Sequence, residues 1–502
     1  MKNLSKTKLL AYRQCPKRLW LEVNRKDLRQ DSATTQANFD VGNQVGDIAR
    51  RLYDPEENGE LLEMKRLGVT GIVARTSELL PVGRPIFEAG FAADGAEALA
   101  DLLMPVAGRG PKRWRMIEVK SSASVKDYHR DDVAIQSSVA RRAGLRLASV
   151  SVAHIDSSWT YPGSQDYAGL LVEVDLTAEA FSREAEVKTW IAESQAVLRK
   201  RAEPVISTGA QCQLPYACGF IEHCSAQEPQ AEYPVAWLPN VRTKALKAYM
   251  DEHGPTELHE VPDELLNETQ LRVKRHTLAG TVYFDAAGAR ADLAKIAKDG
   301  WPAYFMDFET INLAVPIWPG TRPFQQIPFQ FSVHRLARNG RMSQEAFIDL
   351  SGQDPSKAFA RALIDACGDT GPVFAYNASF ERTCLKALAA RLPPLARKLL
   401  SISERVVDLL PVAQRRFYHP MQQGSWSIKD VLPAIAPDLS YDRLAGVADG
   451  AMAMDAYREA IAQTTRSQRR EEIRSELLEY CALDTLAMVR LWQHFAGRAK
   501  AG

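Results

Sequence analysis

Acidic residues at fixed spacing in the C-terminal part of the chain are the first candidates for chemistry. Asp307 and Glu309 stand two apart in the apolar run Ala-Tyr-Phe-Met-Asp-Phe-Glu-Thr. Residues two apart in a strand project from one face, so the run predicts adjacent carboxylates with Phe308 turned into the core. Two divalent metal ions would relieve the repulsion between these carboxylates and activate water for phosphodiester cleavage. A solvated strand end is the alternative interpretation.

Two further segments carry groups that suit the same chemistry. Tyr480 and Asp484 stand four apart in a helical pattern, so they share a face where Asp484 would join the metals and Tyr480 would orient water. An aromatic residue packed near a surface Asp is the simpler interpretation of this spacing alone. Between them, Tyr-Asn-Ala-Ser-Phe-Glu follows a predicted strand and opens a helix, which places Asn377 and Glu381 near the same sheet edge.

In this order the three segments resemble the motifs of the DnaQ-like DEDD superfamily of 3′-5′ exonucleases, in the subtype with Tyr in the third motif. The resemblance covers roughly residues 301–498 and implies a ribonuclease H-like fold, in agreement with the predicted order of strands and helices. It implies that Tyr480 positions the water. It also implies two magnesium or manganese ions held by Asp307, Glu309, Glu381 and Asp484. The second motif usually supplies Asp, whereas this sequence has Glu381.

A second polar set falls on two predicted strands in the N-terminal half. Asp101 lies in Ala-Asp-Leu-Leu-Met-Pro-Val, and Glu118 and Lys120 share one face of Arg-Met-Ile-Glu-Val-Lys-Ser-Ser. Two acids and a lysine are the minimum for metal-assisted phosphodiester hydrolysis, because carboxylates hold the ion and lysine stabilises charge. Glu-x-Lys alone is common on surface strands. Here Glu88 lies upstream and Gln136 lies on the following predicted helix, and both are catalytic candidates.

This set resembles the PD-(D/E)XK nucleases of the RecB-like branch, which implies a restriction-endonuclease-like α/β domain. Asp101, Glu118 and Lys120 match the core motif, in which the two acids would bind metal, and Gln136 matches the helix residue near the site. Two features depart from the branch. The His expected after the first helix is not evident, and Ala140 stands where a Tyr is usual.

Four of the seven cysteines bracket this N-terminal domain. Cys15 precedes it, and Cys212, Cys218 and Cys224 follow it with five residues in each gap. Four thiolates can hold a 4Fe-4S cluster that staples the ends of the domain together. The pattern resembles the iron-sulfur RecB-like nucleases of the AddB type and of the CRISPR-associated adaptation exonucleases, where the first late gap is commonly two residues. Zinc is the main alternative, followed by unligated buried thiols. The remaining cysteines are expected to be packing residues, namely Cys367, Cys384 and Cys481.

Length and composition set the wider frame. A chain of 502 residues exceeds what one core supports. We expect a nuclease domain over residues 1–227, a helical linker over residues 228–300 and an exonuclease domain over residues 301–502.

No stretch approaches the roughly 18 to 20 apolar residues of a membrane span. The N-terminus does not resemble a signal peptide, so we expect a cytoplasmic protein without a membrane partner.

The net charge of +1 means that any nucleic-acid surface must be a local patch. One candidate patch combines four basic residues, as phosphate contacts, with the interleaved Trp114 as a stacking platform for bases. The basic residues are Arg109, Lys112, Arg113 and Arg115. Asp408 and residues 424–429 are candidates for lining the exonuclease channel. The alternatives are a solvated loop for the basic patch, a capping role for Asp408 and an ordinary loop for residues 424–429.

Together these features predict a metal-dependent nuclease that trims DNA from single-stranded or unwound 3′ ends, in repair or defence. The combination of the two domains resembles a bacterial family described only as a domain of unknown function. An RNA exonuclease is one alternative, because no motif reads the 2′-hydroxyl. A non-catalytic nucleic-acid-binding module that keeps both folds is the other. The sequence does not indicate protein partners.

Overall fold

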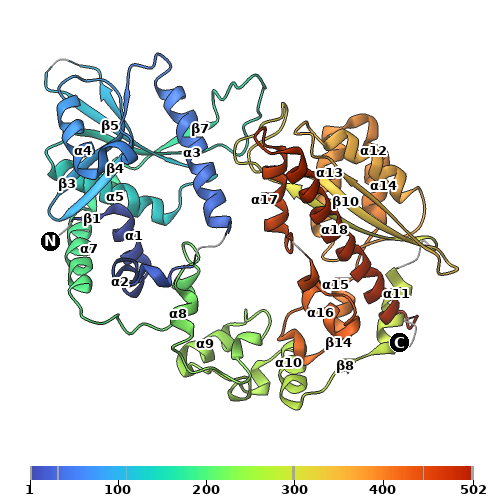
Figure 1. The fold of residues 1–502 in the computed structure, drawn as a ribbon. Coiled ribbons are helices and arrows are strands. Elements are labelled where there is room, and N and C mark those ends of the chain that lie inside the picture. The colour runs from blue at the N-terminus through green and yellow to red at the C-terminus, as the bar shows by residue number, and fades with distance from the viewer. Residues whose placement is uncertain (1–2, 31–32, 109, 297–299, 445, 499–502) are drawn as a thin grey trace. The chain divides into compact units, whose positions relative to one another are not determined.

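A computed structural model describes residues 3–30, 33–108, 110–296, 300–444 and 446–498. The chain forms two compact units, both of mixed α/β structure (Figure 1). Unit 1 consists of Met1–Pro229 with Leu313–Gln325, and unit 2 consists of Gln230–Asn312 with Gln326–Gly502. No helix in the described ranges is both long and apolar enough to cross a membrane.

Unit 1 is built on a sheet with the strand order β2-β3-β4-β5-β6-β7, and β1 pairs with β4. The strands are β1 (Leu4–Ser5), β2 (Glu60–Leu61), β3 (Ile86–Ala93), β4 (Ala96–Val106), β5 (Arg113–Lys120), β6 (Leu147–Ile155) and β7 (Leu171–Asp175). Strands β4 and β5 are antiparallel, whereas β5 and β6 are parallel. A parallel pair needs a crossover, which the helix between these two strands provides.

The helices of unit 1 include those that cover this sheet. They are α1 (Lys6–Gln14), α2 (Pro16–Asn24), α3 (Ala33–Tyr53), α4 (Met64–Leu79), α5 (Asp127–Arg142), α6 (Thr177–Ser182), α7 (Glu184–Leu198) and α8 (Ile221–Ser225). Helix α5 forms the crossover between β5 and β6, and its Val133 packs in one core with Leu9 of α1 and Val150 of β6. The helical segment that begins at Thr177 is interrupted at Arg183, which separates α6 from α7.

Unit 2 contains a second sheet with the strand order β11-β10-β9-β12-β13. The strands are β9 (Ala303–Ile311), β10 (Ile327–Leu336), β11 (Met342–Ile348), β12 (Val373–Ala375) and β13 (Val406–Asp408). The first three along the chain are antiparallel, and β12 and β13 run parallel to β9. Strand β11 was not expected from the sequence because most of it is polar and exposed. A separate pair joins β8 (Tyr283–Phe284) to β14 (Phe417–Tyr418).

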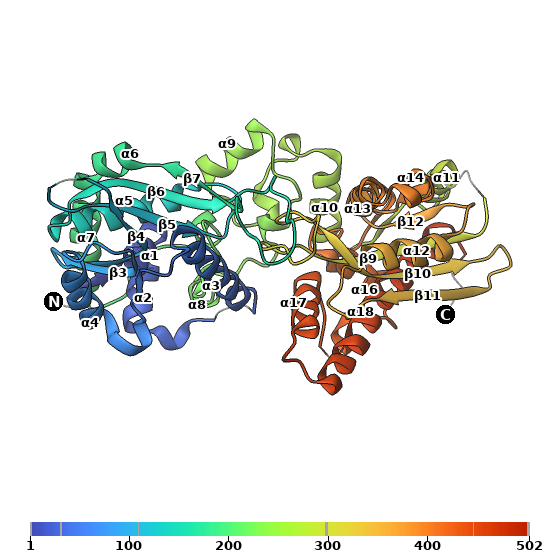
Figure 2. The same cartoon turned by 90° about the horizontal axis from the view of Figure 1, so that it is seen from above.

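The helices of unit 2 include those that cover both faces of this second sheet. They are α9 (Lys244–His253), α10 (Glu268–Ala279), α11 (Ala286–Ile296), α12 (Ser356–Cys367), α13 (Ser379–Arg391), α14 (Ala396–Arg405), α15 (Leu410–Arg416), α16 (Ile428–Ile435), α17 (Gly450–Ile461) and α18 (Ser467–Phe495). On one face Phe305 of β9 contacts Trp492 of α18, and on the other Phe308 contacts Phe359 of α12. Figure 2 shows α18 and α12 on opposite sides of β9 and β10. By strand alternation, Asp307 and Glu309 lie on the α18 face.

Candidate metal centres

Four acidic residues of unit 2 meet in one cavity of about 380 Å³. All five residues that the sequence singled out for this site line it, namely Asp307, Glu309, Glu381, Tyr480 and Asp484. Ligand atoms of Asp307, Glu309 and Cys481 lie within 4.8 Å of one another. The expected adjacency of the two strand carboxylates is therefore present. Cys481 is fully buried, and its sulfur lies 3.9 Å from Asp307 Oδ2.

Three elements bring these carboxylates together. Strand β9 presents Asp307 and Glu309, helix α18 presents Asp484 one turn after Tyr480, and the first turn of α13 presents Glu381. A helix N-terminus favours negative charge, which suits the position of Glu381. Its side chain is buried, and Oε2 has no hydrogen-bond partner. A buried carboxylate oxygen without a partner is costly, and a cation would satisfy it.

Two neighbouring residues take structural roles. Asp408 accepts hydrogen bonds from the backbone N–H groups of Asn377, Ala378 and Leu410. It therefore caps the turn into α13, as the alternative interpretation held, and it does not line the cavity. Asn377 has a positive φ of 64° in that turn and is exposed.

Burial and mutual repulsion make the carboxylates of this cavity poor acids in the metal-free protein. Burial and the charge of Asp484 raise the pKa of Glu309 to about 8. Burial raises the pKa of Glu381 to about 7, with a contribution from Asp408. Burial and the surrounding carboxylates raise the pKa of Asp307 well above its ordinary value. Such clustering of raised carboxyl pKa values is typical of sites that bind cations or transfer protons.

Two functional candidates were not recognised individually from the sequence. Tyr441 donates a hydrogen bond of 2.5 Å to Asp484 Oδ1, although the two residues are 43 positions apart. No local pattern signals such a contact. Lys429 lines the cavity, and its Nζ lies 5.2 Å and 5.3 Å from the ring centroids of Tyr441 and Tyr480. It belongs to residues 424–429, the segment expected to line the channel, and Ile428 lines the cavity as well.

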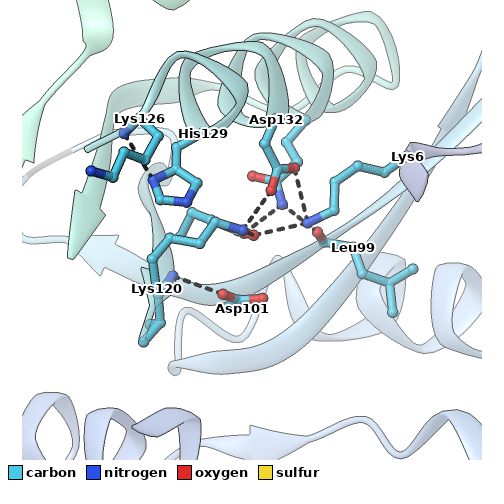
Figure 3. Close-up of polar contacts among 10 residues, drawn as sticks. Lys6, Leu99, Asp101, Lys120, Lys126, His129 and Asp132 are labelled. Carbon is cyan, nitrogen blue, oxygen red and sulfur yellow. Dashed lines mark hydrogen bonds and ion pairs between the residues drawn. The ribbon is translucent and has the colours of Figure 1, made fainter. Parts of the chain in front are cut away.

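A second polar centre forms in unit 1 (Figure 3). Lys120 Nζ lies 2.6 Å from Glu118 Oε1, and Gln136 Nε2 donates to Glu118 Oε2 at 2.5 Å. Asp101 Oδ2 accepts the N–H of Val119 at 2.7 Å. The structure thus joins the predicted strand pair β4 and β5 to helix α5 at Glu118.

Charges act on one another throughout this centre. Burial alone would raise the pKa of Glu118, but the ammonium groups of Lys120 and Lys6 outweigh it and hold that pKa below its ordinary value. Burial and the charge of Glu118 raise the pKa values of both Asp101 and Glu88. Glu88 has a positive φ of 59°, a strained conformation for a residue within a strand. These pKa values place Glu88, Asp101 and Glu118 in one electrostatic environment.

Asp132 and Lys6 complete the centre and were missed from the sequence. Asp132 Oδ2 accepts a hydrogen bond of 2.6 Å from Lys120. Asp132 stands four residues before Gln136 in α5, so the helical spacing could have revealed it. Lys6 contacts Glu118 from 112 residues away, and no local signal could reveal that.

The basic patch expected around Trp114 is only partly available to a ligand. Trp114 is 2% exposed and packs in the core, so its interpretation as a stacking platform was wrong. Strand alternation explains this, because the residue faces the helices that cover the sheet. Arg115 pairs with Glu173 at 3.0 Å. Arg109 lies outside the described residues.

The four cysteines singled out by their spacing line one small cavity of unit 1, namely Cys15, Cys212, Cys218 and Cys224. Cys15 directly precedes α2, Cys212 ends the short turn at Ala210–Cys212, Cys218 lies in the loop before α8, and Cys224 lies in α8. Burial raises the pKa of Cys218, as does the proximity of Cys212 and Cys15. His223 contacts Glu203 at 3.0 Å and does not line this cavity.

Comparison with known families matches part of the chain. Residues 304–427 match a family described as a domain of unknown function, DUF2779. The matched segment includes Asp307, Glu309 and Glu381 and ends before Tyr480 and Asp484. Comparison with curated proteins gives no match.

Proposed function

We propose that unit 2 is a metal-dependent 3′-5′ exonuclease of the DEDD type, acting on single-stranded or unwound DNA ends. The observation that carries this proposal is the convergence of four carboxylates and Tyr480 from three elements in one cavity. The mixed sheet with helices on both faces agrees with the ribonuclease H-like fold expected from the sequence. DNA repair or defence is the process we propose for it.

The donor set fits magnesium or manganese. Carboxylate oxygens are the ligands that both ions prefer. The partnerless Glu381 Oε2 and the raised pKa values of the acids indicate negative charge that the described residues leave uncompensated. Asp307, Glu309, Glu381 and Asp484 would hold the ions. When bound, these ions would supply activated water and stabilise the leaving oxygen in phosphodiester hydrolysis.

The side chains around the carboxylates have separate tasks in this proposal. Burial and Asp484 raise the pKa of Tyr480, so its phenol stays protonated and orients water by donating a hydrogen bond. Tyr441 fixes Asp484 through its own hydroxyl. Lys429 offsets the charge of the phosphate, because it is the only cationic side chain among the described residues lining the cavity. Phe380 is 36% exposed at the cavity and provides a surface on which a base can stack.

We propose a nuclease centre of the RecB-like PD-(D/E)XK type in unit 1. Asp101 and Glu118 would hold a magnesium or manganese ion with Glu88 beside them, and Lys120 would stabilise the charge that develops on the phosphate. The support is the shared electrostatic environment of the three acids and the hold of Gln136 on Glu118.

For the four cysteines we propose a 4Fe-4S cluster. Their side chains line one cavity, so the donor set fits. Zinc, which four thiolates also bind, is the alternative, and the metal content of the purified protein distinguishes the two.

The cofactor proposal predicts the metal content of the purified protein. Anaerobically purified protein should contain iron and acid-labile sulfide and absorb in the visible region, because four thiolates suit an iron-sulfur cluster. Cys218→Ser should lose this absorbance, and Cys384→Ser, a buried thiol of unit 2, should retain it. Stoichiometric zinc without iron would contradict the proposal.

The nuclease proposal for unit 2 is tested on labelled single-stranded DNA and RNA with magnesium or manganese. Asp307→Ala should abolish hydrolysis by unit 2, whereas Asp365→Ala, an exposed acid on α12, should not change it. Faster cleavage of RNA would favour the RNA exonuclease. Binding without cleavage of either polymer would favour a non-catalytic binding module.

A further inference from the structure

Two lysines from distant parts of unit 1 hold the same two carboxylates. Lys6 Nζ lies 2.9 Å from Glu118 Oε1 and 3.0 Å from Asp132 Oδ1. Lys120 Nζ lies 2.6 Å from Glu118 Oε1 and 2.6 Å from Asp132 Oδ2. The four charges therefore alternate around a closed ring, and Figure 3 shows the ammonium groups of Lys6 and Lys120 close to Asp132.

Lys6 balances a charge that Lys120 alone would leave uncompensated. Glu118 is 2% exposed and Asp132 is 3% exposed, so both are removed from water. Two buried carboxylates facing one ammonium group would leave a net negative charge in a poorly solvated place. The second ammonium group also fixes Glu118, because the lysines hold Oε1 while Gln136 holds Oε2.

The helix that carries Lys6 ends at the four-cysteine site. Lys6 is the first residue of α1, and Cys15 directly follows its last residue. Nine residues of α-helix span about 14 Å, at about 1.5 Å of rise per residue. A single rigid element therefore connects the two sites. Leu9 and Ala11 are buried along its length.

Side chains at the end of α1 tie it to both sites. Gln14 Nε2 donates to the carbonyl oxygens of Gln211 at 2.7 Å and Tyr216 at 2.8 Å, on either side of Cys212. Arg13 pairs with Asp131 at 3.0 Å, next to Asp132 on α5. The gap between Cys212 and Cys218 is longer than the two residues common in the iron-sulfur nucleases that the cysteine pattern resembles. It thus supplies the carbonyl of Tyr216, which accepts a hydrogen bond from Gln14 of α1.

We propose that Lys6 is a positioning residue of the unit 1 centre and that α1 makes its position depend on the four-cysteine site. Joining the thiols through a metal group fixes Cys15, and with it the end of α1. Losing that group frees this end, and Lys6 moves away from Glu118 and Asp132. The inference rests on the proposed function of unit 1 for its activity measurement alone.

The first test replaces Lys6 in an Asp307→Ala background, which silences the centre of unit 2. Lys6→Met should slow hydrolysis about tenfold, the order seen when groups around a metal site are changed. It should also tighten Mn²⁺ binding, measured by electron paramagnetic resonance, because the carboxylates lose a competing cation. A merely structural loss would weaken both. Lys6→Arg should restore both, and Lys8→Met on the same helix should change neither.

Weaker Mn²⁺ binding in Lys6→Met, or binding equal to that of the parent, would overturn the role of Lys6. If the Asp307→Ala parent cleaves no nucleic acid, the nuclease proposal for unit 1 fails. The Mn²⁺ measurement still decides the position of Lys6 in that case.

The second test removes the metal group through Cys224, which lies on α8 and not on α1. Hydrogen exchange of the amides of residues 4–14 should rise in Cys224→Ser, and Mn²⁺ binding should shift as in Lys6→Met. Wild-type protein stripped of its metal is compared in the same way, so that an unstable variant does not end the test. Unchanged exchange and unchanged Mn²⁺ binding after metal loss would overturn the coupling. Cysteines that hold no metal in the purified protein would also overturn it.

Discussion

At the scale of single residues, the unit 2 centre is a set of acids held where they resist ionisation. Glu309, Glu381 and Asp484 have pKa values raised by burial to about 8, about 7 and about 6. Their ordinary values are near 4. At these three carboxyl groups the folded metal-free protein therefore binds more protons than the unfolded chain between about pH 4 and pH 8. When the folded state binds more protons than the unfolded state, the free energy of unfolding falls as the pH rises.

This sign predicts a pH dependence of thermal unfolding in the absence of divalent ions. The melting temperature of unit 2 should fall between pH 5 and pH 8 in calorimetry, and Glu309→Gln should flatten the fall because the amide does not ionise. Added Mn²⁺ should raise the melting temperature more at pH 8 than at pH 5, because the metal displaces fewer protons there. A slope that is equal in wild type and Glu309→Gln would contradict this reading of Glu309.

The sequence revealed residues whose spacing lies within one element. Asp307 with Glu309, and Tyr480 with Asp484, share faces that the strand and helix periods determine. Tyr441 and Lys6 reach the two centres only through tertiary packing, so no local spacing could predict them. Trp114 was misjudged because neighbouring arginines suggested exposure, whereas the strand turns its side chain into the core.

At the scale of elements, strand β9 carries the unit 2 centre and the core beneath it on one face. Phe305 precedes Asp307 by two residues and is fully buried against Phe374 and Trp492. The nearly continuous apolar run along β9 made this strand predictable from the sequence. Strand β11 was not predictable in this way, because it pairs at the sheet edge with polar, exposed residues.

Phe305→Ala should therefore destabilise unit 2 far more than Asp307→Ala does. Truncating a buried Phe costs about 3–5 kcal/mol, since the strand cannot close the cavity that is left. The expected result is a lower denaturation midpoint in urea for Phe305→Ala and an unchanged or higher midpoint for Asp307→Ala. Equal midpoints for the two variants would show that Phe305 does not support the site in this way.

At the scale of the whole molecule, unit 1 includes a segment from the middle of the chain. Leu313–Gln325 follows β9 in sequence but packs with unit 1, where Ala314 and Val315 join a core with Ile155. The backbone N–H of Tyr161 donates to the carbonyl of Thr321 at 2.9 Å. Sequence patterns indicate elements but not which core a loop enters. The packing of Leu313–Gln325 in unit 1 was therefore not expected.

A fragment ending at Pro229 should therefore be less stable than unit 1 in the full chain. Without Leu313–Gln325 it exposes the apolar surface around Ile155 that Ala314 and Val315 cover. Adding residues 313–325 through a flexible linker should restore much of the melting temperature. A fragment as stable as unit 1 in the full chain would show that the segment contributes little.

The most direct test of the central claim is to follow release of the terminal nucleotide from 3′-labelled single-stranded DNA in the presence of Mn²⁺. Wild type and Lys120→Ala should release the labelled mononucleotide from the first turnover, because the carboxylates of unit 2 remain intact. Asp307→Ala should release none. Release that survives in Asp307→Ala, or that disappears in Lys120→Ala alone, would contradict the assignment of the exonuclease to unit 2.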